Sequence, residues 1–195
     1  MKIGILAVQG DFAAHSRVLA RMGIDQVEVR RAEDMRGLDG LIMPGGESTT
    51  MLKFLTEEGL ENLIKELARA GKPVFGTCAG AILLAREALN PDQPSLGLID
   101  ISVERNAYGR QVDSFIGEVE TIFEGDSMEA VFIRAPRISR VGSNVEVLAR
   151  LEGNPVFVRE SNILAATFHP ELSADERIHR FFLDMVGEPV AIGGR

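Results

Sequence analysis

The 195-residue sequence contains only one cysteine, Cys78. A single cysteine excludes an intramolecular disulfide and any metal site made of several cysteines. It agrees with a reducing compartment, and we expect a cytoplasmic protein. Basic clusters are also scarce, since none is longer than Arg30–Arg31 and the formal net charge is −8. Nucleic acid is therefore not an expected partner, because its binding needs a cationic surface.

Long apolar runs are missing as well, and none approaches the roughly 20 residues of a transmembrane helix. We therefore expect no membrane partner. The first apolar run, 3–8, is broken by Gln9, Gly10 and Asp11, and no small-residue cleavage pattern follows it. Such a run is typical of a buried first strand rather than of a signal peptide. The length and a hydrophobic content of 45% predict one soluble globular domain over residues 1–195.

The first half of the chain alternates strand-like and helix-like segments. Strands are predicted over residues 3–8, 26–30, 40–43 and 74–75, and helices over residues 12–22, 48–55, 60–70 and 79–89. Asp11 is the predicted cap of the first helix, and Ser48 or Thr49 that of the second. Repeated strand–helix units of this kind indicate a parallel sheet with helices on both faces.

The pattern changes after Asn90, where β-like runs follow one another. Strands are predicted over residues 97–105, 114–123, 130–133, 145–151, 156–159 and 163–168, and a last helix over residues 174–185. The predicted fold class is therefore α/β. We expect a three-layer, open, mostly parallel sheet with helices on both faces and added antiparallel strands in the C-terminal half.

The motif "GTCAG" (76–80) frames the single cysteine. Its G-x-C-x-G form is the thiol counterpart of a nucleophile elbow, a sharp strand-to-helix turn that needs small flanking residues. The start of the following helix would favour the thiolate form of Cys78. The N–H group of Ala79 would then stabilise an oxyanion. The alternative interpretation is a structural cysteine buried between two packing glycines.

The motif "FHPEL" (168–172) places His169 and Glu171 two residues apart after a predicted strand. In an extended chain, which the intervening proline favours, these side chains share one face. A carboxylate beside an imidazole fixes its tautomer, which is the orienting role in a nucleophile–base–orienter triad. The alternative is a strand-end histidine and a solvated glutamate. His15 and His179 lie inside predicted helices, with no acid placed in this way, and are interpreted as surface or helix-packing residues.

The motif "MPGGEST" (43–49) follows another predicted strand. Pro-Gly-Gly lets the backbone approach a ligand without a Cβ in the way, and its amides can supply a second oxyanion donor. An ordinary strand-to-helix turn is the alternative, whereas a phosphate loop is disfavoured because no G-x-x-x-x-G-K-[ST] pattern is present. All three motifs lie where a predicted parallel strand ends, the edge at which open α/β sheets bind ligands.

The segments "PGGEST", "VFGTCAG" and "TFHPEL" resemble the class I (triad) glutamine amidotransferases. More narrowly, they resemble the family of glutaminase subunits of pyridoxal 5'-phosphate synthase. The stretches "IGILAVQGDFAAH", "AYGRQVDSF" and "VFIRAP" resemble the same family. The resemblance therefore extends over nearly the whole chain.

The resemblance implies a role for each motif. Cys78 is the nucleophile that attacks the side-chain amide of glutamine, His169 is its base and later its acid, and Glu171 orients His169. The oxyanion hole is formed by the amides of Gly46 and Ala79, and glutamine is bound by Gly46, Glu47, Ser48, Arg105, Ile133 and Arg134. The arginines suit an amino-acid substrate, because a guanidinium can grip an α-carboxylate.

The implied reaction is the hydrolysis of L-glutamine to L-glutamate and ammonia through a γ-glutamyl thioester. In the family, the ammonia passes to a (β/α)₈-barrel synthase subunit, which combines it with ribose 5-phosphate and glyceraldehyde 3-phosphate. The synthase core is a dodecamer decorated by glutaminase subunits, and each glutaminase is nearly inactive until docked. No metal or organic cofactor is expected, because acyl transfer by a thiol uses none.

Three alternatives stay open at this point. The first is the glutaminase subunit of another amidotransferase, such as imidazole glycerol phosphate synthase. The second is a PfpI-like cysteine hydrolase or cysteine stress sensor, which would share the fold and the elbow but lack the His-x-Glu feature. The third is a binding module in which Cys78 is merely structural.

Overall fold

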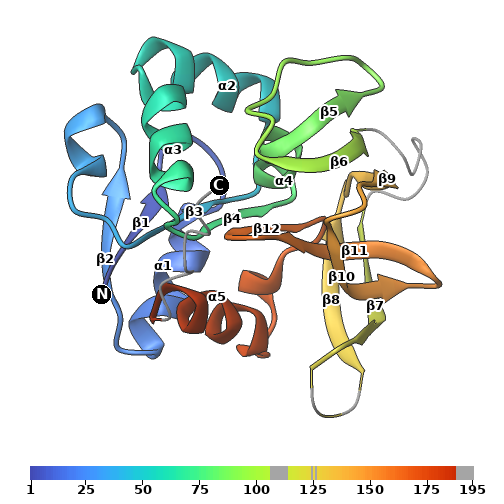
Figure 1. Ribbon diagram of the computed structural model, residues 1–195. Helices are drawn as coiled ribbons and strands as arrows, with labels where there is room; N and C mark the ends of the chain where they lie inside the picture. Colours follow the sequence, from blue (N-terminus) through green and yellow to red (C-terminus); the bar gives the residue numbers. More distant parts are fainter. Residues whose placement is uncertain (106–113, 124, 126, 188–195) are drawn as a thin grey trace.

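The computed structural model describes residues 1–105, 114–123, 125 and 127–187 (Figure 1). Its strands are β1 (Lys2–Leu6), β2 (Asp25–Val29), β3 (Gly40–Met43), β4 (Val74–Thr77), β5 (Ala85–Leu89), β6 (Ile99–Glu104), β7 (Ser114–Thr121), β8 (Met128–Ile133), β9 (Arg137–Val141), β10 (Glu146–Leu151), β11 (Asn154–Glu160) and β12 (Ile163–Ala166). Its helices are α1 (Phe12–Arg21), α2 (Ser48–Glu57), α3 (Leu60–Arg69), α4 (Ala79–Leu84) and α5 (Arg177–Gly187), with the short 3-10 helices η1 (Ala32–Met35) and η2 (Pro170–Leu172).

A nine-stranded sheet, in the order β2-β1-β3-β4-β12-β11-β10-β7-β8, forms the centre of the fold. From β2 to β12 all neighbours pair in parallel. Every residue of β3, β4 and β12 is buried, as expected for strands covered on both faces. Alternate side chains separate into two apolar clusters, Met43 and Val74 in one, Ile42 and Phe75 in the other. The predicted mostly parallel α/β sheet is confirmed.

Helices cover both faces of this sheet (Figure 1). On one face, Leu55 of α2 and Ile64 of α3 join the cluster that contains Met43. On the opposite face, Leu19 of α1 and Phe182 of α5 join the other cluster. The three-layer arrangement predicted from the sequence is therefore present. No helix in the described ranges is both long enough and apolar enough to cross a membrane.

The C-terminal half adds antiparallel strands, as predicted. Beyond β12, the strands β11, β10, β7 and β8 pair antiparallel, each with the next. A second sheet, in the order β5-β6-β9, was not predicted. This second sheet packs against the main sheet through Ile101 of β6 and Ile138 of β9, which belong to the same apolar cluster as Leu55 of α2 and Ile64 of α3. The sequence did not identify β9 because its run "RISRV" contains two arginines and a serine among five residues. In the structure, only one residue of this strand is buried.

The predicted helix over residues 79–89 is wrong in its second half. α4 ends at Leu84, and Ala85 adopts φ −56° and ψ 155° as the first residue of β5. The residues Ala-Arg-Glu-Ala-Leu of β5 favour a helix, so their intrinsic propensity does not explain why α4 ends before them. Pairing with β6 overrides that propensity, and the Ser102 hydroxyl donates a 2.6 Å hydrogen bond to Glu87 across the pair.

Smaller differences occur at the ends of helices. The last helix, predicted over residues 174–185, begins at Arg177 and is preceded by the 3-10 turn η2. α1 begins directly after Asp11, but the Asp11 side chain makes no capping hydrogen bond. Of the stretch "AYGRQVDSF", residues 107–113 lie outside the described residues.

Candidate active site

Cys78 occupies the sharp turn between β4 and α4. Its backbone adopts φ 47° and ψ −103°, a strained conformation for a residue with a side chain. A Cβ added to Gly76 would lie 2.6 Å from the carbonyl carbon of Gly80, and a Cβ on Gly80 would collide with the Met43 carbonyl oxygen. The close packing of the turn therefore requires both glycines. A cysteine that only fills space in the core needs neither a strained backbone nor two flanking glycines. The observed turn therefore favours the nucleophile elbow.

The carboxyl end of the neighbouring strand β12 leads to His169 and Glu171. His169 Nδ1 lies 2.7 Å from Glu171 Oε1, and the two side chains are 7% and 0% exposed. The predicted pairing is therefore present, but the extended backbone expected for it is wrong. The 3-10 helix η2 turns the Glu171 carboxylate back onto the ring. Because β12 pairs in parallel with β4, His169 and Cys78 follow adjacent strand ends.

The protonation state of His169 depends on both of its neighbours. Burial by itself lowers the pKa of His169, but hydrogen bonds with Cys78 and Glu171, and their charges, raise this pKa to about 10. The imidazole is therefore protonated at neutral pH. A protonated imidazole can act as an acid, and here it lies beside a cysteine. The arrangement suits a cysteine nucleophile with an acid next to it.

A cavity of about 380 Å³ opens beside Cys78 and His169. It lies at the carboxyl edge of the parallel strands, where open α/β sheets bind ligands. All six residues predicted to bind glutamine line it, namely Gly46, Glu47, Ser48, Arg105, Ile133 and Arg134. In the described part of the chain, no three His, Cys, Asp or Glu side chains are grouped so that they could hold a metal ion.

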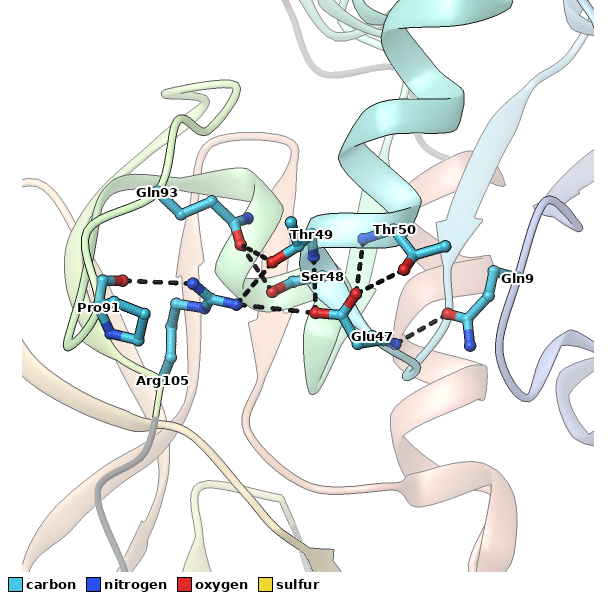
Figure 2. Close-up of polar contacts among 8 residues, drawn as sticks. All are labelled: Gln9, Glu47, Ser48, Thr49, Thr50, Pro91, Gln93 and Arg105. Carbon is cyan, nitrogen blue, oxygen red and sulfur yellow. Dashed lines mark hydrogen bonds and ion pairs between the residues drawn. The ribbon is translucent and has the colours of Figure 1, made fainter.

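Glu47 caps helix α2 at the wall of this cavity. Its carboxylate accepts hydrogen bonds from the N–H groups of Thr49 (3.0 Å) and Thr50 (2.7 Å) and from the Thr50 hydroxyl (2.6 Å) (Figure 2). These bonds, the Thr50 hydroxyl above all, lower the pKa of Glu47 to about 2 against the opposing effect of burial. The predicted cap, Ser48 or Thr49, is therefore wrong. Both hydroxyls instead contact Gln93 Oε1, at 3.0 and 3.1 Å.

Arg105 is held beside Glu47 (Figure 2). Its guanidinium donates hydrogen bonds to Thr49 Oγ1 at 2.9 Å and to the carbonyl oxygen of Pro91 at 3.3 Å, and Nη2 lies 3.7 Å from Glu47 Oε1. The side chain is only 14% exposed. A positioned guanidinium at a cavity wall is suited to bind a carboxylate group of a ligand.

The two residues predicted to form an oxyanion hole both lie next to the reaction centre. Gly46 lines the cavity, and Ala79 is the first residue of α4. The first hydrogen bond within α4 runs from the N–H group of Ile82 to the carbonyl oxygen of Cys78, at 3.2 Å. The N–H group of Ala79 therefore has no acceptor within its own helix. The oxyanion role of both amides stays a prediction.

Gln9 and His15 both lie near the site and were not predicted as site residues from the sequence. Gln9 lines the cavity, and its Oε1 accepts a 2.8 Å hydrogen bond from the N–H group of Glu47. Gln9 follows strand β1, so the rule that ligands bind at strand ends could have found it. His15 is fully buried in α1, with Nε2 3.3 Å from Glu171 Oε2. Helix packing of His15 and His179 is confirmed, and the fold brings Glu171, which is distant in the sequence, beside His15.

Comparisons with known proteins identify the family of this chain. Residues 5–188 match the model of the SNO glutamine amidotransferase family. A protein named pyridoxal 5'-phosphate synthase subunit PdxT, from Koribacter versatilis, is 56% identical over 186 residues, which cover 95% of this chain and 96% of that protein. The protein of the same name from Thermotoga maritima is 53% identical over 187 residues, which cover 95% of this chain and all of that protein.

One solved structure gives the same assignment, and a second supports the fold. A crystal structure described as a glutamine amidotransferase has a TM-score of 0.89 and 51% identity, covering 95% of this chain and 99% of that one. A structure of PurLQS from Thermotoga maritima has a TM-score of 0.70, covering 97% and 96% of the two chains, and at 15% identity it supports the fold alone. The chain belongs to the SNO glutamine amidotransferase family.

Proposed function

We propose that this protein is the glutaminase subunit of a pyridoxal 5'-phosphate synthase and hydrolyses L-glutamine to L-glutamate and ammonia. The observation that carries the proposal is the buried His169–Glu171 pair beside Cys78 at the wall of the cavity. Relatives that are more than half identical over most of the chain carry the name of that subunit. A glutaminase of another synthase and a PfpI-like hydrolase are therefore not favoured.

In the first half-reaction, the Cys78 thiolate attacks the side-chain amide carbon of glutamine. A C–S bond forms, and the negative charge that develops on the amide oxygen is stabilised by the backbone amides of Gly46 and Ala79. The His169 imidazolium gives its proton to the amide nitrogen, the C–N bond breaks and ammonia leaves. A γ-glutamyl thioester on Cys78 remains.

In the second half-reaction, neutral His169 takes a proton from a water molecule as the water oxygen attacks the thioester carbon. The C–S bond breaks, the product leaves as the γ-carboxylic acid and loses its proton to the solvent to give glutamate, and the thiolate and the imidazolium are restored. Glu171 holds the ring through Nδ1 during both steps, so that Nε2 is the nitrogen that exchanges protons. No other reactant is required.

Glutamine recognition follows from the charges at the cavity wall. A free amino acid carries one α-carboxylate and one α-ammonium group. Arg105 and Arg134 provide guanidinium groups for the carboxylate, and the Glu47 carboxylate provides an opposite charge for the ammonium. Ser48 and Ile133 complete this part of the wall.

The partner is inferred to be the (β/α)₈-barrel synthase subunit, arranged as a dodecamer that glutaminase subunits decorate. The family resemblance supports this arrangement, and the name carried by the relatives supports a synthase partner. Ammonia released by a free glutaminase would be lost to the solvent, so low activity of the isolated subunit is expected. Cys78 has to stay reduced in order to act as a nucleophile, and the cytoplasm keeps thiols reduced. We therefore infer a cytoplasmic location.

The test is to measure release of ammonia and glutamate from L-glutamine with and without a pyridoxal 5'-phosphate synthase barrel subunit. We expect low turnover by the isolated protein and at least about tenfold higher turnover in the complex. The cyclase partner of an imidazole glycerol phosphate synthase is the control, and it should not stimulate the reaction. Absence of glutamate formation in the presence of the barrel subunit would overturn the proposed function.

A further inference from the structure

The two oxygens of the Glu171 carboxylate have different surroundings. Oε1 lies 2.7 Å from His169 Nδ1. Oε2 is buried and, among the described residues, makes no hydrogen bond of standard geometry. The Nε2 atom of His15 faces Oε2 at 3.3 Å, and neither side chain has any exposed surface. A buried carboxylate oxygen needs a donor, because leaving it unsatisfied is costly.

His15 belongs to a small polar network inside an otherwise apolar layer. Its Nε2 also lies 3.2 Å from Thr77 Oγ1, and its Nδ1 lies 3.0 Å from Nε2 of His179. Thr77 directly precedes Cys78, and His179 lies on α5. The network therefore connects the strand that presents the nucleophile with the carboxylate that orients its base.

The carboxylate decides which nitrogen of His15 carries a proton. If Nε2 were unprotonated, its lone pair would face the negatively charged oxygen of Glu171 in a buried site, which is unfavourable. With the proton on Nε2, this N–H group is hydrogen-bonded to Thr77 Oγ1, and its positive end also lies beside Glu171 Oε2, at 3.3 Å. His15 Nδ1 then accepts the hydrogen bond that His179 Nε2 donates. The Nδ1 atom of His179, which has no partner in the described residues, carries no hydrogen in this arrangement.

Both histidines are neutral at physiological pH. Burial lowers the pKa of His15 well below its ordinary value, and electrostatic repulsion from the imidazoles of His179 and His169 lowers it further. Burial, with the charge of Arg21, lowers the pKa of His179 to about 4. Each ring therefore carries one proton, as the arrangement of donors and acceptors requires. The donated hydrogen bonds all run in one direction, from α5 through α1 to Glu171.

We propose that His15 is a positioning residue of the glutaminase, whose Nε2–H group holds the second oxygen of Glu171 and so fixes the orientation of His169. The inference rests on the proposed function, because it adds a fourth side chain to that site. His15 does not line the cavity and touches no substrate. Its effect should therefore appear in kcat and leave KM unchanged.

Two matched variants separate this role from simple packing. In His15→Gln the side-chain amide can reach the place of Nε2, whereas in His15→Asn it can reach only the place of Nδ1. Both variants are polar and of similar size. In the complex with the synthase subunit, we expect His15→Gln to keep kcat within about threefold of wild type. We expect His15→Asn to lower kcat about ten- to hundredfold at unchanged KM, the effect of one hydrogen bond to a charged group.

A double-mutant cycle checks that the effect passes through Glu171. In a Glu171→Gln background, the carboxylate that His15 serves is gone, so adding His15→Asn should change kcat less than about twofold. A purely structural role of His15 would give additive losses. Additive losses, equal kcat values for the Gln and Asn variants, or wild-type kcat in His15→Asn would each overturn the inference.

A measurement on the unmodified protein covers the case in which a variant fails to fold. The chain has only three histidines, so ¹⁵N-histidine labelling gives three pairs of ring nitrogen signals. We expect a neutral His15 with its proton on Nε2, and an unprotonated Nε2 would contradict the inference. Failure of the proposed function gives a different result, because wild-type protein would then form no glutamate with the synthase subunit, whatever the tautomer of His15.

Discussion

Replacing Cys78 with alanine is expected to abolish glutaminase activity, with kcat lower by more than about a thousandfold. The substitution removes the sulfur that must form the thioester, and the sequence has no second cysteine to replace it. Loss of the thiol also leaves the His169 imidazolium without one of the partners that raise its pKa. Release of ammonia and glutamate in the complex with the synthase subunit measures this effect.

Binding to the synthase subunit is the control for Cys78→Ala. The residue is only 7% exposed and alanine is smaller, so we expect the fold and the affinity for the partner to stay close to wild type. Cys78→Ser is the matched variant, because it keeps the size of the side chain but carries a hydroxyl that does not ionise at neutral pH. It should be nearly as inactive. Near-normal ammonia release by Cys78→Ala would remove this residue from the mechanism.

Glu171→Gln should reduce kcat by about a hundred- to ten-thousandfold, since a neutral amide neither stabilises the imidazolium nor fixes its tautomer. KM should change little, because Glu171 is fully buried and does not line the cavity. Steady-state kinetics in the synthase complex measure both constants. Unchanged kinetics would remove Glu171 from the triad.

The same variant should shift the pH dependence in a defined direction. Glu171 is one of the groups that raise the pKa of His169 to about 10, so its neutral replacement lowers that pKa. Acylation needs the protonated ring as an acid, and activity is lost as pH rises through this pKa. The alkaline limit of kcat should therefore move to lower pH in Glu171→Gln, whereas a shift to higher pH would contradict the role of the carboxylate.

Much of the site could be predicted because its residues lie in short local motifs. Cys78 and His169 each follow a buried strand, and the carboxyl ends of parallel neighbours meet at one edge of the sheet. The motif spacing did not determine the backbone, since His169 and Glu171 pair through a 3-10 turn rather than an extended segment. Residue type and order therefore predicted the contact but not its geometry.

Segments whose structure depends on distant partners could not be predicted. The residues of β5 favour a helix by propensity and become a strand only because β6 lies beside them. The role of His15 could not be predicted for the same reason, because it depends on residues that are distant in the sequence. Its partners are Thr77, Glu171 and His179, which the fold collects from three other elements, and nothing in the sequence around His15 indicates this.

The central claim is that Cys78 forms a covalent bond with the side-chain amide carbon of glutamine. The most direct test is to incubate the synthase complex with a glutamine analogue that carries a diazoketone in place of the side-chain amide, followed by peptide mass spectrometry. We predict one label per chain, on Cys78, with excess L-glutamine protecting against it. An unmodified Cys78 at saturating analogue, or labelling of another residue alone, would contradict the account.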